Sequence, residues 1–154
     1  MKKYFETNTK RVDVLGVELE WQLRSGDTSE QYCVLTAVVP PGVGIPPHQH
    51  PEQEAFFVLD GQPEFAVSGP GDLAWRVAGP GDMVNIPPHA LHGFRNHSDR
   101  VVKVLITCAP GLGRFFEEAG VPLADGESAC PHPGPEAVQR VLAIAEKHGQ
   151  CFIG

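Results

Sequence analysis

Apolar and polar residues alternate strictly over residues 17–23, which read Val-Glu-Leu-Glu-Trp-Gln-Leu. An alternation with a period of two predicts a β-strand with one buried face. Further strands are predicted at residues 31–39, 54–59, 64–67, 73–77, 83–86, 91–96 and 101–108. Turn-forming residues separate them, among them Asp60-Gly61 and the two Gly-Pro-Gly-Asp segments within 68–72 and 78–82. Strands that recur about every ten residues between such turns predict an all-β sandwich or barrel.

The pattern becomes helical after residue 110. Residues 112–119 place apolar side chains three and four positions apart, which predicts a short helix ending at Gly120. A second helix is predicted from Pro135 to His148, after a Pro/Gly-rich link at 121–134 and before Gly149. Its apolar stripe consists of Val138, Val141, Leu142 and Ala145. We expect both helices to pack on the outside of the barrel, with the stripe in the core.

Length and charge narrow the class of protein. The 154 residues suit a single domain, with a barrel core at about 12–110 and a helical C-terminal extension at about 111–154. The net charge of −7 and the lack of a basic run disfavour nucleic acid and anionic membranes as partners. The segment Met1 to Glu6 lacks the apolar core of a signal peptide, so we expect a cytoplasmic protein.

The four cysteines show no C-x-x-C spacing and no dense framework, and we expect reduced thiols. They are Cys33, Cys108, Cys130 and Cys151. Cys130 and His132 are close in sequence and could hold a metal, but no second pair has matching spacing, so a loop thiol beside a loop histidine is the simpler interpretation.

The segment at residues 42–54 concentrates candidate metal ligands. Side chains two positions apart share a face of an extended chain, so His48 and His50 point the same way. Glu54 keeps the same parity, and Glu52 is the rival carboxylate. Because Pro51 favours a bend before Glu52, we prefer Glu54. Two imidazoles and a carboxylate suit Fe, Mn, Ni, Zn, Co or Cu.

A second segment, residues 81–96, adds His92 at the start of a predicted strand. If that strand lies beside the first segment, His92 completes a set of four ligands. Spacing alone leaves metal binding and ordinary packed histidines equally open. His97, His132 and His148 have no such partners in the sequence, and we assign them no role.

Together the two segments resemble the cupin superfamily. Residues 42–61 read G-x5-H-x-H-x3-E-x6-G, which is the first cupin motif, and residues 81–96 match the second motif, G-x5-P-x-G-x2-H-x3-N, except at one position. The matching residues are Gly42, His48, His50, Glu54, Gly61, Gly81, Pro87, His92 and Asn96. The resemblance implies a jelly-roll barrel of six to eight strands, frequent homodimers, and one divalent metal ion bound by His48, His50, Glu54 and His92.

One position departs from the second motif, since His89 stands where the family usually has glycine. That glycine serves a turn at positive φ, and we interpret His89 as filling the turn. A role for His89 at the pocket rim is the alternative. The segment at 110–120 and the helix that follows also resemble the small quercetin-dioxygenase-like (cupin 2) group.

These features lead to a hypothesis about function. Phe56 and Val58 share the parity of Glu54, and Phe94 shares that of His92, so these residues are expected to line a pocket, and for Phe56 plain core packing is equally open. A metal site with an apolar wall favours a small enol, enediol or phenolic ligand. By analogy with dioxygenase cupins, the leading hypothesis is metal-dependent dioxygenation, with Glu54 also acting as a base. The alternatives are a non-oxidative isomerase or lyase, and a small-molecule-binding module without catalysis.

Overall fold

The computed structural model describes residues 10–68 and 73–153. The predicted turn at 68–72 lies mostly outside this part of the chain, and so does the segment Met1 to Glu6. The described residues form two β-sheets and two α-helices, so the predicted all-β jelly-roll barrel with helices outside is confirmed.

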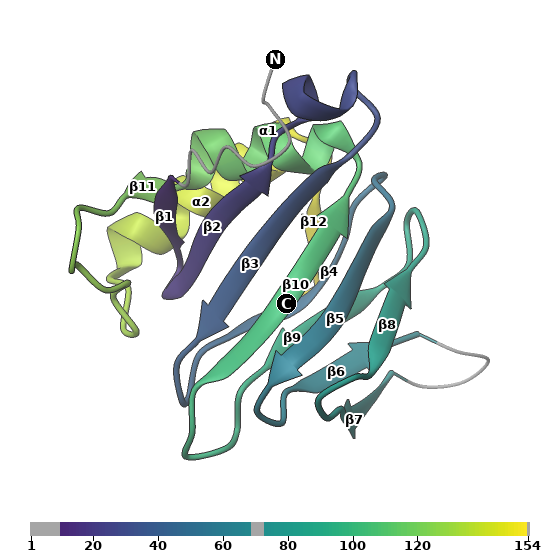
Figure 1. The fold of residues 1–154 in the computed structure, drawn as a ribbon, viewed down its shortest axis with the longest axis vertical. Coiled ribbons are helices and arrows are strands. Elements are labelled where there is room, and N and C mark those ends of the chain that lie inside the picture. The colour runs from purple at the N-terminus through teal and green to yellow at the C-terminus, as the bar shows by residue number, and fades with distance from the viewer. Residues whose placement is uncertain (1–9, 69–72, 154) are drawn as a thin grey trace.

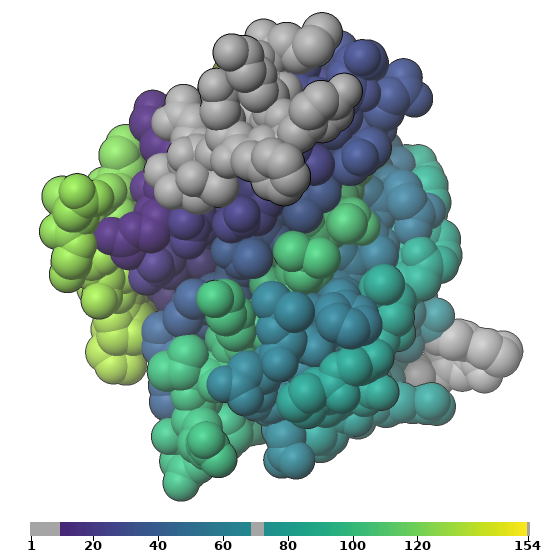
Figure 2. Space-filling view, viewed as in Figure 1, coloured from purple at the N-terminus to yellow at the C-terminus, as the bar shows by residue number. Residues whose placement is uncertain are grey.

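The larger sheet has seven strands in the order β11-β1-β2-β3-β10-β5-β8, all paired antiparallel. In chain order they are β1 (Arg11–Val14), β2 (Val17–Leu23), β3 (Cys33–Val39), β5 (Glu54–Asp60), β8 (Met83–Ile86), β10 (Val102–Cys108) and β11 (Val121–Pro122). Buried and more exposed residues alternate along β2 and β3, because one face of this sheet covers the core. Figure 2 looks onto the opposite face of this sheet, and side chains of β10, β5 and β8 form much of the surface there.

The smaller sheet has five strands in the order β12-β4-β9-β6-β7. They are β4 (Gly44–Gln49), β6 (Glu64–Val67), β7 (Ala74–Val77), β9 (His92–Arg95) and β12 (Cys151–Phe152). In Figure 1 this sheet lies behind the larger one, and the helices flank β1 and β2. The sheets hold more strands than the six to eight expected, partly because the two-residue strands β11 and β12 extend their edges.

Strand β4 was not predicted as a strand, because it contains Pro46 and Pro47. Proline cannot donate to a β-ladder. The pairing with β9 accommodates both prolines through a register irregularity between Ile45 and His48. At this point β9 approaches closely: a Cβ atom on Gly93 would lie 3.0 Å from the carbonyl oxygen of Ile45.

The helices begin and end near their predicted limits. Helix α1 (Pro110–Ala119) starts two residues earlier than predicted, with proline at its first position, and α2 (Pro135–Lys147) ends one residue earlier. A short 3₁₀ helix, η1 (Ser25–Thr28), joins β2 to β3. Leu112, Phe115 and Val141 belong to the same hydrophobic core as the strands. Of the predicted stripe of α2, Val141 and Ala145 are buried, whereas Leu142 is exposed.

All four cysteines are free. Cys33 and Cys108 are buried opposite each other on β3 and β10, and Cys130 and Cys151 are exposed. Within residues 10–68 and 73–153, no helix combines the length and apolar character needed to cross a membrane.

Candidate metal centre

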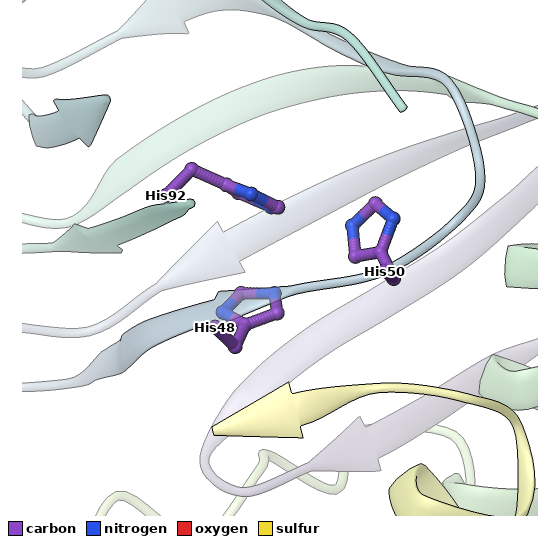
Figure 3. Close-up of side chains that lie close together, drawn as sticks. All are labelled: His48, His50 and His92. Atoms are coloured by element: carbon purple, nitrogen blue, oxygen red, sulfur yellow. The ribbon is translucent and has the colours of Figure 1, made fainter. Parts of the chain in front are cut away.

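Three histidine side chains converge inside the barrel. His48 lies in β4, His50 follows this strand directly, and His92 begins β9. The two strands are neighbours, with His48 paired to His92, so the adjacency assumed from the sequence is confirmed. Figure 3 shows the three rings facing a common centre. All three residues are buried, and one ring nitrogen from each lies within 4.8 Å of the other two.

Backbone carbonyl groups fix the orientation of each ring. The Nδ1 atoms lie 2.9 Å from the oxygen of Pro46, 3.0 Å from that of Glu52 and 2.8 Å from that of Ala90, for His48, His50 and His92 respectively. A carbonyl only accepts hydrogen bonds, so each Nδ1 carries the proton and donates. The lone pair of each Nε2 is therefore available to a metal ion. The Nε2 of His92 is buried and has no hydrogen-bond partner in the described part of the chain.

The two candidate carboxylates lie on opposite sides of the His50 ring. An oxygen of Glu54, the first residue of β5, lies 3.1 Å from Nε2 of His50 and 3.4 Å from Nε2 of His92. An oxygen of Glu52 lies 3.6 Å from Nδ1 of His50 instead. Glu54 thus faces the common centre, and Glu52 stands behind the ring.

Burial and charge set the protonation of these groups. Burial, together with the nearby His92, lowers the pKa of His48 from 6.5 to about 4, so this ring is neutral at pH 7. Burial alone would raise the pKa of Glu54, but the hydrogen bond with His50 and the nearby ring of His92 hold it at about 2. Burial also opposes protonation of His50, yet the hydrogen bond to Glu54 raises the pKa of His50 above its usual value. A proton and a metal ion would compete for this nitrogen.

The backbone of the second motif supports the site. His89 has a φ of +64°, the conformation expected for the glycine position of that motif, and its N–H donates to the carbonyl oxygen of His50 at 2.7 Å. The side chain of His89 is exposed and does not line the cavity beside the histidines, as expected if it fills the turn. Asn96 is fully buried, and its Nδ2 donates to the carbonyl oxygens of Val39 and Arg100. Its backbone also exchanges hydrogen bonds with Gly42 and Val43.

An apolar cavity adjoins His48, His50 and Glu54. It is lined by Val14, Leu15, Val17, Leu19, Ile45, His48, His50, Glu54, Phe56, Phe94, Ile106, Leu112, Phe115, Phe116, Val141, Gln150 and Phe152. Phe56 and Phe94 thus stand where the sequence places them, and their ring centres are 5.6 Å apart. The prediction that Val58 lines the pocket was wrong. It is fully buried in the core and does not line this cavity, because it lies one pleat further along β5 than Phe56.

Sequence reasoning missed the contribution of the C-terminal region to this cavity. Side chains of α1 and α2 complete its wall, and the ring of Phe152 stacks on His48 with ring centres 5.0 Å apart. Gln150, between α2 and β12, also lines the cavity. The helical periodicity indicated buried faces but not what they would cover, and a lone glutamine gives no signal in a sequence.

The remaining histidines lie elsewhere. His148 is bonded to Glu118 at 2.6 Å, His97 is exposed beside Glu64, and His132 is exposed. Among the described residues, the three convergent histidines are the one group of three or more that could hold a metal ion. Cys130 and His132 gather no further ligands there.

The sequence profile of the cupin domain (Cupin_2) matches residues 35–108, the stretch that holds both motifs and all three histidines. Residues 35–108 thus form a cupin domain. The polyketide cyclase RemF from Streptomyces resistomycificus has the same fold, with a TM-score of 0.59 and 21% identity over 71% of this cupin and 80% of that chain. At 21% identity, the similarity to this cyclase concerns the fold alone.

Two curated relatives are more similar in sequence. Acireductone dioxygenase from Bacillus pumilus is 36% identical over 75 residues, which cover 46% of this cupin and 43% of that protein. Dimethylsulfoniopropionate lyase DddQ from Ruegeria pomeroyi is 35% identical over 78 residues, which cover 51% and 37%. The chain thus spans less than half the length of these relatives.

The donor set suits a metal ion. Three imidazole Nε2 atoms on rings that backbone carbonyl groups orient, one of these atoms buried without a partner, are a typical donor set for a first-row transition metal. The cupin therefore has a candidate three-histidine metal site.

Proposed function

We propose that this cupin is a metal-dependent dioxygenase acting on a small enol, enediol or phenolic compound, with His48, His50, Glu54 and His92 as the ligands of one divalent ion. The observation that carries the proposal is the convergence of three Nε2 atoms and a buried carboxylate beside an apolar cavity. When bound, the ion would supply Lewis acidity that favours the deprotonated enol and the one-electron chemistry that dioxygen requires.

The residues of the chain would perform three tasks. The carbonyl groups behind the rings hold each Nε2 in place, so ligand geometry needs little rearrangement. Phe56 and Phe94 offer an apolar wall for a planar substrate and exclude water from it. Glu54 is ionised at neutral pH and could accept the proton of a substrate hydroxyl group. A carboxylate with a pKa of about 2 is a weak base, so we expect Glu54 to act mainly as a metal ligand.

Oxygen consumption tests this proposal. Protein loaded separately with Fe²⁺, Mn²⁺, Ni²⁺ or Co²⁺ is mixed with flavonols, catechols and acyclic enediols in an oxygen electrode. We expect substrate-dependent uptake with at least one metal, its loss in His92→Ala, and its retention in His97→Ala, which removes an exposed histidine outside the site. No uptake across this panel would contradict the dioxygenase.

A non-oxidative lyase is the second candidate, because the lyase relative matches this cupin about as well as the dioxygenase relative does. A carboxylate beside a metal site also suits removal of a proton next to a carbonyl group. Turnover of a keto acid or a sugar under argon would favour this class. Tight ligand retention without turnover in either assay would favour a binding module.

Three further expectations belong to this proposal. We propose that the chain forms a single domain, since helices and strands share one core, and limited proteolysis should yield no stable fragment. We expect a homodimer, which light scattering measures. We also expect cytoplasmic localisation, which fractionation of the source cells tests.

A further inference from the structure

Gln150 stands out among the residues that line the cavity. Of the seventeen, four have polar side chains, and three of these, His48, His50 and Glu54, belong to the proposed metal site. The fourth is Gln150, whose relative exposure is 6%. Its Nε2 atom is buried and has no hydrogen-bond partner within the described ranges. A buried amide donor without a partner is costly, and natural proteins rarely keep one without a use.

The backbone on both sides holds Gln150 in place. Its own N–H donates to the carbonyl oxygen of Ala145 at 2.9 Å, after Gly149 has turned the chain at a φ of +79°. Directly after it, β12 pairs with β4, and Phe152 lies opposite His48. The carboxamide is therefore fixed on the segment that covers a proposed metal ligand, and it is not a free surface group.

The charge of the lining limits what can bind. Among the residues that the structure describes, no ionisable side chain outside the proposed metal site lines the cavity, and none of the lining residues is lysine or arginine. A phosphate or a second carboxylate on the ligand would lose its hydration without gaining a counter-charge. An uncharged oxygen, in contrast, needs only one donor.

We propose that Gln150 donates a hydrogen bond from Nε2 to an uncharged oxygen of the substrate, such as a ketone or ether oxygen. The enol or phenol oxygens of the same molecule face the proposed metal ligands, and the apolar wall contacts its body. The inference rests on the proposed function, since it assumes a ligand bound at that centre. The expected ligands are small compounds without phosphate that carry one uncharged acceptor oxygen besides the metal-binding group.

The size of the cavity agrees with a small ligand. Its volume is about 50 Å³. At roughly 10–15 Å³ for each enclosed water, this is room for a few molecules of water or for one compact ligand. The cavity is also partly open to solvent, so one end of a ligand can extend outward.

A pair of matched catechols tests the hydrogen bond. The probes are 3,4-dihydroxyacetophenone, which has a ketone oxygen, and 4-ethylcatechol, which has the same shape without it; 3,4-dihydroxybenzoate serves as the charged analogue. Their dissociation constants are measured by calorimetry under argon with Ni²⁺-loaded protein. The variant is Gln150→Met, which keeps length but removes the donor, and the control is Gln139→Met at an exposed position of α2.

We expect Gln150→Met to reduce the ratio of the two affinities, ketone over ethyl, by about tenfold, the value of one neutral hydrogen bond. The different acidity of the two catechols cancels, because the ratio is compared between proteins. Gln139→Met should leave the ratio unchanged, and the benzoate should bind no more tightly than the ketone. An unchanged ratio in Gln150→Met, or no binding of either uncharged catechol to the wild type, would overturn the inference.

Thermal unfolding without ligand gives a second readout. Removing an unpaired buried donor should raise the Tm of Gln150→Met by about 2–4 °C. A lowered Tm would mean that the amide already has a partner in the unliganded protein, and this also contradicts the inference. Failure of the dioxygenase proposal is distinguishable, since the catechols would then bind with the expected preference but consume no oxygen.

Discussion

Replacement of Glu54 by glutamine tests which carboxylate serves the metal site. The substitution keeps the shape of the side chain and removes its charge. Glu54 is 4% exposed, and its carboxylate lies within 3.4 Å of two histidine nitrogens. Its pKa is about 2, against an ordinary value of 4.5. At about 1.4 kcal/mol for each pKa unit, its surroundings favour the carboxylate by about 3 kcal/mol.

Two effects of Glu54→Gln are expected at pH 7. Without metal, the free energy of unfolding should fall by up to about 3 kcal/mol, because the depressed pKa contributes stability at every pH above 4.5. In the wild type this contribution should disappear as the pH falls from 4.5 to 2. With metal, the affinity for Co²⁺ should fall at least about 100-fold, or about 2.7 kcal/mol, since a charged ligand is lost.

The matched variant is Glu52→Gln, which removes the carboxylate behind His50. An oxygen of Glu52 lies 3.6 Å from the Nδ1 atom, so its loss should weaken Co²⁺ binding by about tenfold, as for a group that orients a ligand. Competition titration against a chromophoric chelator measures both affinities, and urea unfolding measures the stabilities. If Glu52→Gln weakens binding as much as Glu54→Gln, the assignment of Glu54 as the ligand is refuted.

The remaining predictions concern histidines and one asparagine. Purified without chelators, His48→Ala and His92→Ala should lose bound metal in elemental analysis, while His97→Ala retains it; equal metal content in all three would refute the site. The pKa of His48 is about 4 in the folded chain against 6.5 ordinarily, so the unfolded chain binds the proton first. The metal-free protein should therefore lose about 3 kcal/mol as the pH falls from 6.5 to 4, and His48→Gln should flatten this profile in urea titrations. His89→Gly should stabilise the protein by about 1 kcal/mol, because it relieves a positive φ, and should leave the metal content unchanged; a loss of metal would give the His89 side chain a role at the site. Asn96→Ala should destabilise the protein by about 3 kcal/mol in the same assay, because buried carbonyl groups lose their donor, and a change below about 1 kcal/mol would contradict this.

Local patterns predicted most of the strands. Those over 17–23, 64–67 and 83–86 have the predicted limits, because alternation and turn residues act within a few positions of each other. The strand over 44–49 was missed, since two prolines argue against a strand unless the partner strand tolerates a bulge. That tolerance depends on Gly93, far away in the sequence.

The candidate site was likewise only partly predictable from local sequence patterns. The shared direction of His48 and His50 follows from their spacing on an extended chain. The choice between Glu52 and Glu54 does not follow from spacing, because both residues have the same parity as the histidines. Only the course of the chain around Pro51 separates the two carboxylates. Val58 was misplaced for a related reason, since parity gives the face of a strand but not the depth at which a cavity ends.

The sequence by itself determined the fold class, the turn at positive φ that His89 occupies and the residues that could bind a metal. Each depends on properties of a few neighbouring residues, such as the freedom of glycine or the period of a strand. The tertiary structure alone decided that His92 stands opposite His48, and that α1, α2 and Gln150 complete the wall of the cavity. These features join segments about 40 to 100 residues apart, and their register depends on how whole sheets and helices pack, which local patterns do not encode.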